Sequence, residues 1–169
     1  MTIHPKVKKH LELNKVKYQV VPHKKVYTAW DAAATLKVKL EEIAKSLVVK
    51  ADKTYYLLIL AANKNANLAK LQKSLKAKKV RIPKETELVK VFKVKPGGLT
   101  GFGSLHGLPV IVDKGYQKVK QAIFSGGSLV ESVKLKVADY LKLEQALVHA
   151  FSEAKKFKKI KKAKKSKRV

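Results

Sequence analysis

The sequence contains no cysteine, which excludes disulfide bonds, thiolate nucleophiles and Cys-based zinc or iron–sulfur sites. It also lacks a long apolar run. The longest, 55–62, has the length of a strand, whereas a membrane-spanning helix needs about 20 residues. The amino terminus has neither the apolar stretch nor the small-residue cleavage site of a signal peptide. From these absences we expect a cytoplasmic protein.

Acidic residues are scarce, with 12 Asp and Glu against 39 Lys and Arg in 169 residues and a formal net charge of +27. Ten of the fifteen residues in 155–169 are basic and none is acidic, yet residues 1–154 still hold 29 basic and 12 acidic residues, a net charge of +17. This surplus predicts a polyanionic partner, either a nucleic acid or an anionic membrane surface. Arginine occurs only as Arg81 and Arg168, which favours attraction to phosphates over reading of bases.

The order of apolar and polar residues predicts an α+β domain. The run 55–62 is apolar on both faces, which is typical of a central strand. Because helices and strands alternate irregularly, we expect one compact domain over 1–154, with a mixed, mostly antiparallel sheet that curls like a barrel between flanking helices. Residues 155–169 form a Lys-rich tail, helical or disordered. The predicted helices are 5–14, a segment from Thr28, 40–45, 67–75, 83–91, 114–121 and 137–151; the predicted strands are 18–21, 46–50, 55–62, 79–82, 109–113, 122–125 and 130–135.

Glycine is absent from the first 96 residues, and all eight glycines lie between Gly97 and Gly127. Five of them fall within 97–107, and a Gly-Gly pair follows Ser125. Glycine lets a ligand approach the main chain closely, so two Gly-rich loops favour a pocket lined by N–H and C=O groups, although ordinary turns use glycine too. The spacing fits neither a P-loop nor a dinucleotide-binding motif.

Few residues form a catalytic pattern. No HExxH motif occurs and the five histidines are scattered, so we expect no metal site and no cofactor. A GxSxG motif is absent, because Gly107 lies one residue too late after Ser104. Lys45 precedes an apolar segment; there a lysine is either partly desolvated, or holds a phosphate or carboxylate, or is an ordinary surface residue. His23 is likewise either a site residue or a loop residue.

Seven short motifs follow one another in the order found in a known family. They are His23-x4-Thr28, Glu42-Ile-Ala-Lys-Ser-Leu-Val-Val49, Leu68-x2-Leu71, the segments 78–81 and 108–113, Pro96-Gly97-Gly98-x4-Gly103, and Ser125-Gly126-Gly127. In chain order and with their spacing, these motifs resemble the YbaK/ProX family, which is related to the editing insertion of bacterial prolyl-tRNA synthetase. The resemblance covers about residues 5–145.

The resemblance implies an enzyme that hydrolyses, in trans, the ester of mischarged tRNA of the Ala- or Cys-tRNA-Pro class. It implies that Lys45 contacts the acylated terminal adenosine and that the loop 97–103 holds the ester. The catalytic residues that it implies are therefore Lys45, Gly97, Gly98 and Gly101. The substrate-binding residues that it implies are His23, Thr28, Trp30, Gly103, Ser125, Gly126 and Gly127.

The charged tail is not part of the family pattern, and its expected role is to bind tRNA phosphates through Lys155, Lys156, Lys158 and Lys159. tRNA is then the expected partner, an aminoacyl-tRNA synthetase is a further candidate, and no membrane partner is expected.

The chain departs from the family pattern at two positions. Gly101 stands where a proline is usual, and Ser132 where many members have an acidic residue. One alternative is therefore a non-catalytic tRNA- or RNA-binding protein on the same fold. A second is a membrane-surface or nucleic-acid-condensing protein that acts through its tail.

Overall fold

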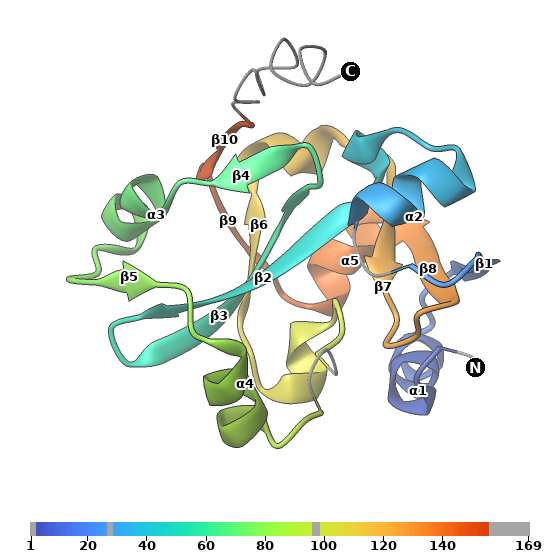
Figure 1. Ribbon diagram of the computed structural model, residues 1–169, viewed down its shortest axis with the longest axis horizontal. Coiled ribbons are helices and arrows are strands. Elements are labelled where there is room, and N and C mark those ends of the chain that lie inside the picture. Colours follow the sequence, from blue (N-terminus) through green and yellow to red (C-terminus); the bar gives the residue numbers. More distant parts are fainter. Residues whose placement is uncertain (1–2, 27–28, 96–98, 156–169) are drawn as a thin grey trace, which may run out of the picture.

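Figure 1 shows the computed structural model of the chain, which describes residues 3–26, 29–95 and 99–155. A five-stranded sheet lies at its centre, in the order β5-β2-β3-β6-β9. These strands are β2 (Ala44–Ala51), β3 (Thr54–Ala61), β5 (Val80–Arg81), β6 (Val110–Asp113) and β9 (Leu147–His149). β2 is antiparallel to β3 and β5, whereas β6 is parallel to β3 and β9. The predicted central position of the 55–62 strand is confirmed.

Two smaller sheets complete the described fold. β1 (Tyr18–Pro22), β8 (Glu131–Lys136) and β7 (Gln121–Ser125) form an antiparallel sheet, and β10 (Ser152–Ala154) pairs with β4 (Lys64–Ala66). The three-stranded sheet meets the central one at an isolated bridge between Ile43 and Ile123. The pairing is mixed and mostly antiparallel, as predicted. The predicted barrel-like curl is wrong: the described strands form three separate sheets, two of them joined at this isolated bridge, and they do not close into a barrel.

Helices lie around the sheets (Figure 1). α1 (Pro5–Leu13) lies near β1, α2 (Ala29–Leu36) precedes β2, α3 (Leu68–Leu75) lies beside β5, and α4 (Glu85–Phe92) and α5 (Val137–Leu143) follow later. Short 3₁₀ helices form at Leu40–Glu42, Gly103–His106 and Lys114–Lys118. The Asn67 side chain caps α3 by accepting the N–H of Lys70 at 3.0 Å. Within the described residues, no helix is long and apolar enough to span a bilayer.

The buried side chains form three apolar clusters. The largest contains the aromatic residues Phe102, Phe124 and Tyr140, with the rings of Phe124 and Tyr140 stacked 4.1 Å apart. A second cluster gathers Leu58, Leu60 and Leu71 with Phe151 on the α3 side of the central sheet, and a smaller one surrounds Ile43. The two faces of β2 therefore pack into different clusters, because successive side chains of a strand point to opposite faces.

Two segments differ from the predicted elements. The helix predicted over 137–151 ends at Leu143, where Gln145 takes a positive φ of 47°, and the chain then enters β9. The buried residues Val137 and Tyr140 of α5 and Phe151 after β9, together with the apolar residues between them, match the spacing of one longer helix. The helix predicted over 40–45 covers only Leu40–Glu42, because β2 already begins at Ala44.

Candidate active site

The amino-terminal end of β2 separates two groups of predicted site residues. Lys45 pairs with Leu60 of β3, and Leu60 belongs to the cluster on the α3 side of the sheet. Ser46 points to the other face, with Ala44 and Val48, which belong to the largest cluster. The structure therefore places Lys45 and Ser46 on opposite sides of one strand. We call these the lysine side and the glycine side.

On the lysine side, three residues from different elements come together. Lys45 is half-buried, and both this burial and the nearby positive charge of Lys155 lower the pKa of its ammonium group. Lys155 directly follows β10, and its Nζ lies 5.2 Å from the ring centroid of Trp30 in α2. The Trp30 side chain is 45% exposed. Two ammonium groups beside an accessible indole make a surface suited to a phosphate and a stacked base.

The carboxylate of Asp113, at the end of β6, holds the chain at 151–152, just before β10 and Lys155. This buried carboxylate accepts the N–H groups of Phe151 and Ser152, each at 3.0 Å, and the Ser152 hydroxyl at 2.8 Å. β10 then pairs with β4, so that the chain leaves the described fold beside Trp30. The Lys-rich tail therefore begins at the candidate site.

On the glycine side, Gly101 lies against β7. Its N–H donates to the Ser125 carbonyl at 2.9 Å, and its own carbonyl accepts the Tyr140 hydroxyl at 2.7 Å. A Cβ at Gly101 would lie 3.3 Å from the Ser125 nitrogen and 3.4 Å from Ser46 Oγ. Only a residue without a side chain fits this approach without displacement of its neighbours.

A cavity of about 260 Å³ adjoins this contact, between β2, β3, α4 and the segment before Gly101. Its lining residues are largely apolar, and the polar ones are Ser46, Glu85 and Thr100. Ser46 Oγ is buried and has no hydrogen-bond partner in the part of the chain that the structure describes. A buried hydroxyl without a partner is costly, so this one is available to a ligand.

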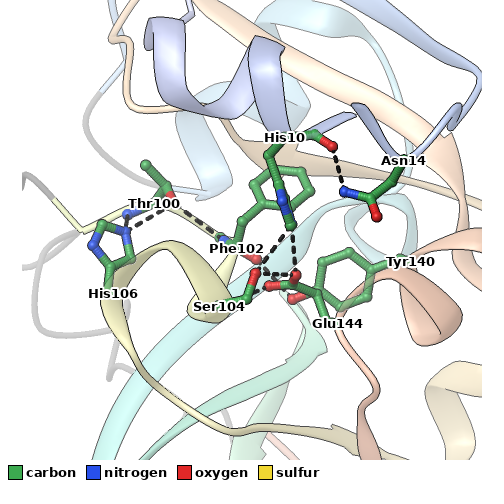
Figure 2. A network of polar contacts seen from close by, with 9 residues as sticks. His10, Asn14, Thr100, Phe102, Ser104, His106, Tyr140 and Glu144 are labelled. Atoms are coloured by element: carbon green, nitrogen blue, oxygen red, sulfur yellow. Dashed lines mark hydrogen bonds and ion pairs between the residues drawn. The ribbon is translucent and has the colours of Figure 1, made fainter. Parts of the chain in front are cut away.

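Four main-chain N–H groups of the glycine side already have acceptors within the protein, three of which Figure 2 shows. The N–H of Thr100 donates to His106 Nε2 at 3.0 Å, that of Phe102 to Thr100 Oγ1 at 3.2 Å, and that of Ser104 to Glu144 Oε1 at 3.1 Å. The fourth, from Gly101, donates to Ser125. An oxyanion bound by any of these four groups would have to displace its present acceptor.

Of the other predicted site residues, some make contacts that the structure describes, and the rest lie outside the described residues. His23 Nδ1 donates to the Lys24 carbonyl at 2.8 Å, and Nε2 lies 2.9 Å from the Ser132 hydroxyl oxygen. Gly126 packs against Ile3, and Gly127, with φ of 82°, lies between His4 and Thr100. Gly103 packs under Leu108. Gly97, Gly98, Thr28, Lys156, Lys158 and Lys159 lie outside the described residues.

Three residues that the sequence interpretation did not select hold the glycine side in place. Glu144 is buried and accepts the Ser104 hydroxyl at 2.6 Å, while His10 Nε2 lies 3.0 Å from both Glu144 Oε2 and Ser104 Oγ (Figure 2). Tyr140 holds the Gly101 carbonyl, and burial raises the pKa of its phenol. These partners lie in α1, in α5 and directly after α5. Because these positions are far from the glycines in sequence, no local motif indicates them.

Residues 23–143 match the profile of the aminoacyl-tRNA editing domain, and the chain therefore belongs to this family. The family predicted from the seven motifs is confirmed. A hypothetical protein of known structure is 21% identical, with a TM-score of 0.79 over 88% of this chain and 99% of that one. A protein described as a candidate trans-editing enzyme for prolyl-tRNA synthetase is 22% identical, with a TM-score of 0.73 over 90% of this chain and 100% of that one. No curated protein matches the chain.

Proposed function

We propose that this protein is a trans-editing deacylase that hydrolyses the ester of mischarged tRNA of the Ala- or Cys-tRNA-Pro class. The observation that carries the proposal is the half-buried Lys45 near the charge of Lys155, whose ammonium lies over Trp30. On the other side of the same strand end lies a cavity with a Ser46 hydroxyl that has no partner among the described residues. The lysine side suits the phosphate and base of a terminal nucleotide, and the cavity suits a small aminoacyl group. Membership of the editing-domain family supports the same activity.

In this proposal the tRNA terminus crosses the end of β2. The Lys45 ammonium holds the terminal phosphate or ribose on one side, and the aminoacyl group enters the cavity at Ser46 and Gly101 on the other. Water attacks the ester carbonyl, the bond from the carbonyl carbon to the ribose oxygen breaks, and that oxygen takes a proton. The products are the free amino acid and uncharged tRNA, and no cofactor takes part.

The remaining predicted residues have supporting roles. Gly97 and Gly98 would supply N–H groups to the developing oxyanion, because the N–H groups of Thr100, Gly101, Phe102 and Ser104 already have acceptors. His23, Thr28, Gly103 and the segment Ser125-Gly126-Gly127 would border the bound substrate. Lys155, Lys156, Lys158 and Lys159 would contact tRNA phosphates from the start of the tail. We expect the protein to act in the cytoplasm, on aminoacyl-tRNA and in the neighbourhood of a synthetase.

The first test is single-turnover deacylation of a panel of mischarged tRNAs that includes alanyl- and cysteinyl-tRNA for proline. We expect Lys45→Ala to slow turnover about 100-fold or more, because a charge that holds the substrate in place is lost. Lys50→Ala is the matched control: Lys50 lies on the same strand, over the ring of Tyr55, and its removal should leave turnover unchanged. Equal rates for Lys45→Ala and the wild type would refute the role of Lys45.

One observation favours a second candidate, a tRNA-binding protein without catalysis. Gly101 stands where a proline is usual in the family, and its N–H donates to the Ser125 carbonyl, a hydrogen bond that a proline cannot make, so this segment is held differently from the family pattern. Tight tRNA binding without turnover of any panel member would support this candidate. In that case Gly101→Pro would be the first variant to test for recovered activity.

A further inference from the structure

The imidazole ring of His106 joins the two ends of the segment 100–106 by hydrogen bonds to Thr100 (Figure 2). His106 Nε2 lies 3.0 Å from the Thr100 nitrogen and 3.0 Å from Thr100 Oγ1. A main-chain N–H can only donate, so Nε2 accepts and carries no proton. The ring is therefore neutral in this structure, with its proton on Nδ1.

Thr100 connects this ring to the cavity. It is 3% exposed, it contributes to the cavity wall near Ser46, and it directly precedes Gly101. Its hydroxyl accepts the N–H of Phe102 at 3.2 Å, and its methyl group lies beside Gly127. A displacement of Thr100 would therefore move the cavity wall and the Gly101 peptide together.

The surroundings of His106 favour its neutral form. Burial is the largest cause that lowers its pKa, and the positive charges of His4 and Lys6 lower it further, whereas Glu144 raises it. A protonated Nε2 would point its own N–H at the Thr100 N–H, and the buried amide would lose its acceptor. Since the unfolded chain takes up this proton more readily, acidification below the ordinary histidine pKa also lowers the free energy of unfolding.

We propose that His106 is a positioning residue for the deacylation: its neutral ring holds Thr100, and with it the cavity wall, so the site is assembled only while His106 is unprotonated. This inference rests on the proposed function. It assigns the acid limit of the activity to a residue outside the predicted site. The substrate contacts themselves remain with Lys45 and the cavity.

The kinetic test compares pH profiles of single-turnover deacylation for the wild type, His106→Gln and His106→Leu. In the wild type the rate should fall about tenfold per pH unit once His106 takes up its proton. The amide oxygen of Gln can accept the Thr100 N–H and does not titrate, so His106→Gln should keep the neutral-pH rate within about threefold and lose this acid limb. His106→Leu should be slow at every pH. His149→Gln, on β9, is the matched control and should keep the wild-type profile.

A second measurement needs no turnover. The amide resonance of Thr100 should titrate with the midpoint of His106 in the wild type and stay constant in His106→Gln. The proposal would be overturned if the acid limb persisted unchanged in His106→Gln. It would also be overturned if the amide resonance of Thr100 in the wild type did not shift as His106 titrates. If the Thr100 amide responds but no tRNA is hydrolysed, the proposed function fails and His106 still holds Thr100.

Discussion

The lysine side and the glycine side, on opposite faces of the amino-terminal end of β2, are held together by different kinds of contact. On the glycine side, neighbouring N–H and C=O groups have partners inside the protein, and the packing leaves no room for a Cβ at Gly103 and only a tight fit at Gly101. On the lysine side, the main contact is the Lys155 cation over the Trp30 indole, and burial together with the Lys155 charge lowers the pKa of Lys45. The glycine side is therefore held by packing and hydrogen bonds within the protein, whereas the lysine side offers positive charge to a ligand.

This difference predicts two kinds of variant. Substitutions on the glycine side should reduce folding stability first, because they disturb packing and buried hydrogen bonds. Substitutions of the exposed groups on the lysine side should leave stability almost unchanged, because exposed charges contribute little to it, and should weaken binding or turnover instead. A substitution with the opposite effect would contradict this division of roles.

The largest stability effect is expected for Gly103→Ala. A Cβ there would lie 2.6 Å from the Leu108 carbonyl oxygen and 2.7 Å from Val110 Cγ2, so the main chain itself must move. We expect a loss of about 2–3 kcal/mol in the free energy of unfolding, measured by urea denaturation. The control is Gly107→Asn: Gly107 has a φ of 69° and open space around its Cβ position, and Asn tolerates this conformation, so the loss should be at most about 1 kcal/mol. Equal losses in the two variants would show that Gly103 is not a packing glycine.

A smaller loss is expected for Glu144→Gln. The buried carboxylate accepts three hydrogen bonds, two from Ser104 and one from His10, whereas an amide offers only one acceptor atom. We expect stability to fall by about 1–2 kcal/mol, because one donor is left facing the NH₂ group. Glu12→Gln is the control, since Glu12 is exposed and its carboxylate accepts the Tyr18 hydroxyl alone among the described residues. If both variants unfold at the same urea concentration, the network around Glu144 does not stabilise the fold.

The sequence predicted most of the elements, because their signals are local. The doubly apolar run of β3, the Asn67 cap and leucine spacing of α3, and the Gly-rich segment near 101 each depend on neighbouring residues. The extent of α5 could not be predicted in the same way. Its end depends on the pairing of β9 with β6, a contact between segments far apart in the chain.

The faces of the sheet on which Lys45 and Ser46 lie could not be predicted without the residue at which β2 begins. A helix predicted over 40–45 leaves Lys45 outside the following strand, so no face of the sheet can be assigned to it. Once Ala44 begins β2, the two-residue period of a strand places Lys45 and Ser46 on opposite sides. The hydrogen bond from Tyr140 to Gly101 spans 39 residues, and no pattern within either segment indicates it.

The smallest change in stability, and a specific change in binding, is expected for Trp30→Ala. Loss of a stacked base weakens single-strand binding by about 1–3 kcal/mol, so affinity for the 3′ end of tRNA should fall about tenfold or more, while Trp30→Phe should keep most of it. Fluorescence anisotropy with labelled tRNA measures this loss, and thermal unfolding should show no change. Leu147→Ala is the control, because Leu147 is 47% exposed on β9 and equally apolar. If both alanine variants lose the same affinity, the effect is one of exposed apolar area. If only Trp30→Ala does, and if adding Lys155→Ala causes little further loss, the ring and the ammonium bind as one unit, and the tail begins in the site that it serves.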